Sequence, residues 1–158
     1  MKLESSQTFI ISREEAAERD HSRFRTGRPC KAGHLAERYV SNRQCVACNI
    51  HEARMRERRR SQDDPSYRMY RNVQRRTGQV LKGRHSPKEA LKCNLATLRE
   101  HISSRFKAGM VWAQYGQWEV DHIVPLSAAK SEVELIELCQ FTNLQPLWKR
   151  ENQKKGGA

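Results

Sequence analysis

The chain has 158 residues, of which 37% are apolar and 30% are charged, and its 30 Lys and Arg outweigh 18 Asp and Glu to give a formal net charge of +12. No run approaches the ~20 apolar residues of a membrane helix, and the N-terminus lacks the charged-then-apolar order of a signal peptide, so we expect a cytoplasmic protein with no membrane partner. The apolar fraction is low for a chain of this length. We therefore expect one hydrophobic core plus a small segment that is stabilised by something other than buried apolar surface.

The first predicted unit is a metal-binding segment. Four candidate ligands form two pairs in the pattern C-x3-H-x10-C-x2-C: Cys30 with His34, and Cys45 with Cys48. The ten residues between the pairs favour a strand and then a turn, which predicts a zinc-stapled hairpin over about 28–50 within an N-terminal segment of residues 1–52. Tetrahedral Zn²⁺ takes four such ligands, and the metal would replace the core that so short a segment cannot build.

Two alternatives remain open at this site. The three cysteines could act without His34, or His51 could supply the fourth ligand, because it lies three residues after Cys48. The other cysteines, Cys93 and Cys139, have no ligand neighbours in the sequence and are expected to be small buried hydrophobic residues.

Residues 53–93 are expected to form a basic helical connector. Within 53–76, nine arginines and three carboxylates give a charge of +6, half of the net charge of the chain. One helix continues from the second ligand pair, and Pro65 suits the first turn of a second helix over about 65–76. Clustered Lys and Arg bind polyanions by releasing phosphate counterions, although a basic helix surrounded only by solvent is the alternative. The arginines expected to contact phosphates are Arg54, Arg56, Arg58, Arg59, Arg60, Arg68, Arg71 and Arg75.

Residues 94–158 are predicted to form the main folded unit. Asn94 is a good N-cap, and apolar residues recurring at steps of three and four predict an amphipathic helix over about 94–109. His101 falls among polar residues of this helix and is expected to be solvated. The unit then continues with a strand, a short capped helix, a second extended segment and a final helix, expected at 118–124, 131–139, 144–148 and from Lys149 onward. The fold class predicted is α+β and mostly helical.

Three motifs in this unit resemble the HNH nucleases, the ββα-metal family. The motifs are Asp121-His122-Ile123-Val124-Pro125, Asn143 in TNLQPLW and Asn152 in KRENQKKG, nine residues further on. The segments QWEVDHIVPLSAA and FTNLQPLWKRENQKKG also look like the HNH endonucleases of tailed bacteriophages, and CKAGH followed by CVAC is similar to a zinc-binding segment that often precedes such domains. The resemblance covers residues 94–157, about 40% of the chain. It implies a C-terminal ββα-metal (HNH) core with flanking helices, which hydrolyses DNA with the help of a divalent ion.

The resemblance gives each matched residue a role. His122 would act as the general base that activates water, which requires an uncharged ring near neutral pH. Asp121, on the opposite face of the strand, would bind the catalytic ion together with Asn152, and Asn143 would tie the loop that holds the base. Many HNH sites have histidine at the position of Asn152, whereas the HNH domain of RNA-guided CRISPR nucleases has asparagine there. Two oxygen ligands suit Mg²⁺ or Mn²⁺.

The expected partner is DNA, double-stranded, bound by a monomer or weak dimer in the cytoplasm, the host cell's if the protein is phage-encoded. Lys154 and Lys155 are expected either to contact phosphates beside the scissile one or to form an ordinary basic helix end. Two other functions stay open. One is a zinc-ribbon DNA-binding module with a degenerate nuclease domain, against which the full set of matched residues argues. The other is a packaging factor that binds a phage terminase and nicks DNA as an accessory activity.

Overall fold

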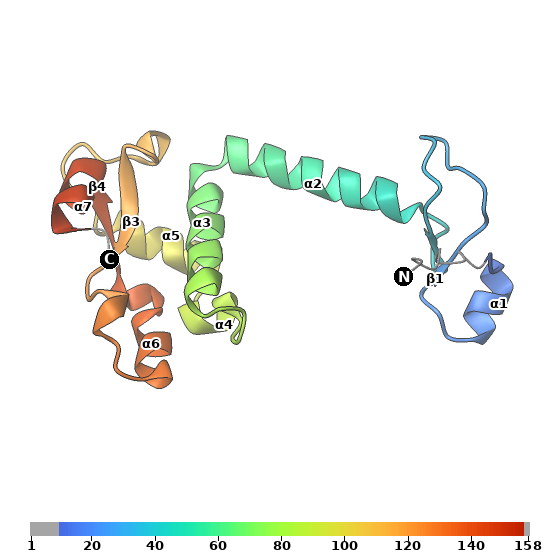
Figure 1. Ribbon diagram of the computed structural model, residues 1–158. Helices are drawn as coiled ribbons and strands as arrows, with labels where there is room; N and C mark the ends of the chain where they lie inside the picture. Colours follow the sequence, from blue (N-terminus) through green and yellow to red (C-terminus); the bar gives the residue numbers. More distant parts are fainter. Residues whose placement is uncertain (1–9, 157–158) are drawn as a thin grey trace, which may run out of the picture. The chain divides into compact units, whose positions relative to one another are not determined.

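The computed structural model describes residues 10–156, and contacts within the chain group them into two units that divide between Arg59 and Arg60. Each unit contains helices and one two-stranded antiparallel sheet (Figure 1). The predicted α+β class is therefore confirmed. Over the described range, we find no helix with the length and apolar character needed to cross a membrane.

The first unit is built around the pair of strands β1 (Arg23–Phe24) and β2 (Arg38–Tyr39). The helix α1 (Arg13–Glu18) precedes them, and the Ser12 side chain caps its first turn. After β2 the chain turns back on itself, since the Tyr39 N–H donates to the Gln44 carbonyl at 3.0 Å. The turn predicted between the ligand pairs is thus present. The strand before this turn, β2, also pairs with β1, which precedes both ligand pairs in the sequence. This third segment is needed because an isolated hairpin is only marginally stable.

The basic segment forms two helices that meet at Asp64. α2 (Val46–Asp63) starts in the first unit and ends in the second, and only Val46 on it is buried. α3 (Pro65–Val80) begins at the expected proline, and the Asp64 carboxylate caps it by accepting from the Ser66 and Tyr67 N–H groups. The predicted break between the helices is confirmed, and α3 runs four residues further than predicted.

The core of the second unit includes α3. Figure 1 shows α3 beside α4 (Pro87–Leu91) and α5 (Leu95–Ser103), and all three contribute buried side chains. The core residues are Met69, Tyr70, Val73, Leu91, Leu98, Ile102, Met110, Trp118, Val120 and Leu144. Trp118 is 0% exposed and has three aromatic rings around it at centroid distances of 5.0–5.4 Å. Much of the segment expected to be a connector therefore folds with the main unit.

The second sheet consists of β3 (Trp118–His122) and β4 (Leu144–Trp148), in antiparallel register with Asp121 opposite Gln145. Between the strands lie α6 (Glu132–Leu138) and the 3₁₀ turns η2 (Leu126–Ala128) and η3 (Phe141–Asn143); another such turn, η1 (Trp112–Gln114), precedes β3. α7 (Lys149–Lys155) follows β4 directly and packs on both strands (Figure 1). These elements match the predicted order, with β3 ending two residues earlier than predicted.

Three details of the main unit differ from prediction. α5 ends at Ser103 rather than near residue 109. The expectation of a solvated His101 was wrong, because its Nε2–H donates to the Leu144 carbonyl at 2.8 Å and its ring meets the Phe141 ring edge-on. His101 thus lies on the side of α5 that meets β4. Cys139 is fully buried as predicted, whereas Cys93 is only half-buried against the core.

Candidate metal centre and candidate active site

The predicted metal ligands of the first unit lie together. One ligand atom from each of Cys30, His34, Cys45 and Cys48 lies within 4.8 Å of all the others. The Sγ atoms of Cys30 and Cys48 are 3.6 Å apart, and His34 Nδ1 is 3.2 Å from Cys48 Sγ. Bonds of about 2.0–2.3 Å in a tetrahedron separate ligands by roughly 3.3–3.8 Å. The Cys₃His cluster is therefore compatible with a structural zinc site, and its nitrogen ligand is His34 rather than His51.

Local backbone geometry brings the two pairs together. The Cys30 N–H donates to the His34 carbonyl at 3.0 Å, and the Gly33 N–H donates back to the Cys30 carbonyl at 2.8 Å, which closes a tight turn. Gly33 adopts φ +84°, a conformation that residues with side chains rarely take. Cys45 lies just before α2, and Cys48 lies in its first turn. A glycine turn thus positions Cys30 and His34, and the start of α2 positions Cys45 and Cys48.

The thiols of this cluster differ in acidity. Burial raises the pKa of Cys30, but hydrogen bonds from the backbone of His34 and Ala32 and from the neighbouring thiols outweigh it and bring the pKa down to about 6. The hydrogen bond with Cys30, followed by burial, raises the pKa of Cys48 to about 11. The cluster therefore carries a thiolate at neutral pH. A thiolate is the form of cysteine that binds a metal.

The second site lies where α7 covers β3. Trp118 and Val120 are buried in the core, so the alternating side chains of Glu119 and Asp121 point to the other face, toward α7. There, Asn152 Nδ2 donates to Glu119 Oε2 at 2.8 Å. The ammonium of Lys155, one helical turn after Asn152, lies 2.6 Å from Asp121 Oδ2. The strand and the helix thus meet through two successive polar pairs.

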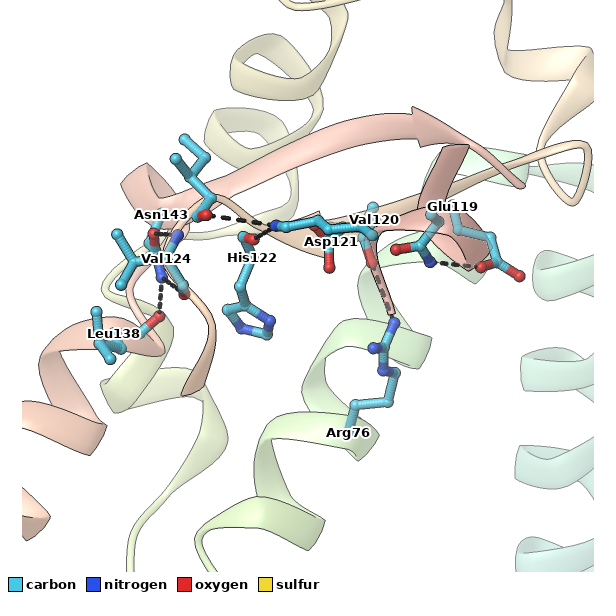
Figure 2. Close-up of polar contacts among 11 residues, drawn as sticks. Arg76, Glu119, Val120, Asp121, His122, Val124, Leu138 and Asn143 are labelled. Carbon is cyan, nitrogen blue, oxygen red and sulfur yellow. Dashed lines mark hydrogen bonds and ion pairs between the residues drawn. The ribbon is translucent and has the colours of Figure 1, made fainter. Parts of the chain in front are cut away.

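His122 lies on the opposite face of β3 from Asp121. Figure 2 shows its ring on the side of the strand from which Arg76 approaches, and Arg76 Nη1 donates to the Val120 carbonyl at 3.1 Å. Burial lowers the pKa of His122 below its ordinary value, and the charges of Arg76 and Lys155 lower it further, against the opposing effect of Asp121. The ring is therefore uncharged at neutral pH, as a general base requires.

Asn143 ties the chain that follows His122 (Figure 2). Its Oδ1 accepts from the Val124 N–H at 2.9 Å, while its Nδ2 donates to the carbonyls of Val124, at 3.0 Å, and Leu138, at 2.8 Å. The Ile123 N–H donates to the Asn143 carbonyl at 2.8 Å. These four bonds hold the end of β3 against the segment between α6 and β4.

The residues expected to contact phosphates have different surroundings. On α2, the five arginines of residues 54–60 are exposed, and the Arg60 guanidinium lies 4.0 Å from the centre of the Tyr67 ring. On α3, Arg71 and Arg75 are exposed, whereas Arg68 turns inward and donates to the Tyr115 carbonyl at 3.2 Å. At the end of α7, Lys154 is exposed, while Lys155 is bound to Asp121. The exposed set is thus largest on α2.

Sequence reasoning missed two residues of the second site, Glu119 and Arg76. Glu119 lies two residues before Asp121, so the period of a strand would have placed both carboxylates on one face. Arg76 lies three residues after Val73 and one before Thr77, both buried, so the helical period places it beside the inward face of α3. The expected stripe through Arg68, Arg71 and Arg75 did not include it.

Comparison with known proteins gives little further information. No protein family matches the chain, and no solved structure matches it. The chain is 29% identical over 113 residues to an uncharacterised protein of Acanthamoeba polyphaga mimivirus. That alignment covers 68% of this chain and 50% of the relative, so the chain spans about half the length of the curated protein it matches.

Proposed function

We propose that the second unit is a metal-dependent HNH endonuclease that hydrolyses phosphodiester bonds in DNA, by nicking or by cutting both strands. One observation carries the proposal. A neutral histidine and a carboxylate lie at the end of β3, which α7 covers, and Asn143 holds the loop that follows β3. The residues in these positions are those of the motifs that resemble the ββα-metal family.

In this proposal His122 takes the proton of the attacking water. A neutral imidazole can accept a proton, and general bases of this kind typically contribute 10²–10⁴-fold in rate. The bonds of Asn143 to Val124 and Leu138 keep the end of β3 in place, so the ring is presented in one orientation. Burial and, after it, the charge of Arg76 lower the pKa of His122 and favour the uncharged ring, and Arg76 also offers a cationic group on the same side for a phosphate.

The oxygen atoms near Asp121 fit a hard divalent cation. The Asp121 carboxylate and the carbonyls of His122 and Ile123 already surround a positive charge, the Lys155 ammonium. Asn152 uses its Nδ2 to donate to Glu119, which leaves its Oδ1 as the second ligand. Such an oxygen set suits Mg²⁺ or Mn²⁺. A bound ion of this kind would supply positive charge beside the scissile phosphate and its leaving oxygen.

We further propose that the Cys₃His cluster holds one structural Zn²⁺ and that the exposed arginines of α2 bind the DNA backbone. The cluster is closed, with four protein ligands, which is typical of structural rather than catalytic zinc. The arginines of α2 project from a helix with only one buried residue, so their side chains are available to a polyanion. Binding of this kind would be independent of sequence.

Incubation with supercoiled plasmid tests the proposed activity. The zinc-loaded protein should convert the plasmid to open-circular or linear DNA in Mg²⁺ or Mn²⁺ and should not do so in EDTA. His122→Ala protein purified in parallel controls for contaminating nucleases. Intact plasmid in both metals, with a folded protein, would contradict the proposal.

A further inference from the structure

The Lys155 ammonium lies among three oxygen atoms. It is 2.6 Å from Asp121 Oδ2, 2.5 Å from the His122 carbonyl oxygen and 3.3 Å from the Ile123 carbonyl oxygen. Two of the three acceptors are backbone atoms of the loop whose position Asn143 fixes. The side chains are not fully enclosed, since Lys155 keeps 33% of its side-chain surface exposed and Asp121 keeps 17%.

A divalent ion bound to Asp121 Oδ2 and this ammonium cannot occupy the site together. A metal bound to the Asp121 carboxylate would lie at about 2.0–2.6 Å from an oxygen atom, the same distance at which the ammonium lies. Two positive centres so close repel strongly in a partly buried site. Metal binding at Asp121 Oδ2 therefore requires Lys155 to leave.

The geometry of α7 allows Lys155 to leave without moving the helix. Glu151 holds the start of α7, because its carboxylate accepts from Lys107 Nζ at 2.7 Å and from the Trp148 N–H at 3.2 Å. Lys155 is the last residue of the helix, with Gly156 directly after it. A rotation of the long lysine side chain is enough to free the carboxylate and to point the ammonium at solvent or at a nearby phosphate.

We propose that Lys155 is an internal counter-cation of the active site: it occupies the cation position while no metal is bound, is displaced by the divalent ion, and so lowers the affinity of the site for that ion. This role rests on the proposed function in that Asp121 is taken as a ligand of the catalytic ion. It is a third role for Lys155, beside the phosphate contact and the ordinary basic helix end that the sequence left open. Displacement would make the ammonium available to the substrate only after the metal has bound.

Titration of Mn²⁺ into the zinc-saturated protein without DNA, followed by calorimetry, tests this role. Lys155→Met should bind Mn²⁺ at the Asp121 site at least about fivefold more tightly than the wild type, the lower end of ordinary coupling between two sites. Lys155→Gln provides a second variant in case the methionine disturbs folding. Lys154→Met is the matched control, since it removes the same charge one residue earlier and leaves the Asp121 contacts in place. Asp121→Asn identifies the heat that belongs to this site.

Equal affinity in the wild type and in both Lys155 variants would overturn the proposal. An equal gain in Lys154→Met would also overturn it, because the effect would then reflect overall charge rather than displacement. Mn²⁺ binding that does not depend on Asp121 would have the same consequence. Tighter binding in the Lys155 variants of a protein that cleaves no DNA would support the displacement and would remove the nuclease proposal alone.

Discussion

His122 and Asp121 are adjacent in the chain but meet different surroundings, and the difference defines their chemistry. His122 shares its face of β3 with the core and with Arg76, which favours the neutral ring. Asp121 shares its face with α7 and meets a cation there. His122 therefore suits proton transfer, and Asp121 suits the binding of a cation.

The first prediction at this scale concerns the pH dependence of cleavage. Because burial and the charge of Arg76 hold the pKa of His122 below its ordinary value, kcat/KM should rise with pH and break at a lower pH than an ordinary histidine would give. Arg76→Gln removes a positive charge that disfavours the imidazolium, so the break in the pH profile should move upward. Arg75→Gln, the same change on the exposed face of α3, should leave the break in place. A break that does not move in Arg76→Gln would contradict the assignment of the base.

The same shift has a consequence for stability. A histidine whose pKa is lowered on folding binds a proton less readily in the folded than in the unfolded chain. Its contribution is therefore present above pH 6.5 and is lost as the pH falls through the lower, folded value. Urea unfolding should show a smaller loss of stability toward acid pH in His122→Ala than in the wild type, and an equal loss in both would count against this account.

A second prediction concerns Glu119. Its carboxylate accepts from Asn152 Nδ2 at 2.8 Å and thereby fixes which amide atom of Asn152 is left as a ligand. Glu119→Ala should weaken Mn²⁺ binding by roughly 10-fold, the lower end for loss of a group that orients a ligand, while Glu119→Gln, which retains an acceptor, should weaken it less. Equal weakening in both variants would mean that the negative charge, rather than the orientation of Asn152, is what matters.

At the scale of elements, the predictions that succeeded rest on local signals. Asp64 with Pro65 marks the start of α3, and Asn94 marks the start of α5, because capping depends only on residues in the first turn. The pairing of β1 with β2 and the packing of His101 against β4 could not be predicted this way, since both depend on contacts between residues far apart in the sequence. Long-range contacts also explain why Arg76 was missed.

The candidate sites show the same difference between local signals and long-range contacts. Asp121, His122, Asn143 and Asn152 could be named as candidates because their motifs are short and ordered along the chain. The contact between Lys155 and Asp121 joins residues 34 positions apart, and no motif predicted it. The metal cluster was predictable from spacing alone because each ligand pair is local, whereas the choice of His34 over His51 required the fold.

The third prediction belongs to the first unit as an element. Cys45→Ser should remove the tightly bound zinc, about one equivalent in the wild type, and should unfold the first unit, because binding of a structural metal supplies folding free energy. Cys93→Ser, which changes a half-buried cysteine outside the cluster, should retain the metal. Elemental analysis after dialysis and circular dichroism measure both effects. A wild-type protein without bound zinc would refute the assignment.

At the scale of the whole molecule, the charge distribution separates the basic residues from the proposed chemistry. Residues 53–76 carry +6, whereas residues 121–158 carry as many acidic as basic side chains and have a net charge of zero. In the proposed function, the basic segment supplies affinity for a polyanion, and the site on β3 and α7 supplies the reaction.

The fourth prediction tests this division. Arg58→Ala with Arg59→Ala should weaken binding to all DNA sequences alike and should lower the slope of log K against log salt by about 0.9 for each phosphate that is no longer neutralised. Arg60 is left unchanged because it stacks on Tyr67. Lys82→Ala with Lys130→Ala removes the same charge from exposed positions elsewhere and should preserve the slope. An unchanged slope in the arginine variant would mean that the arginines of α2 contact solvent rather than DNA.

A titration of Mn²⁺ against plasmid nicking tests the proposed roles of His122 and Asn152 most directly. His122→Ala should lower the rate by roughly 10²-fold or more at every Mn²⁺ concentration, because added metal cannot replace a proton acceptor. Asn152→Ala should recover much of its activity as Mn²⁺ rises, because it weakens only the binding of the ion. Nicking by His122→Ala at the wild-type rate, or its rescue by Mn²⁺ as readily as that of Asn152→Ala, would contradict the account.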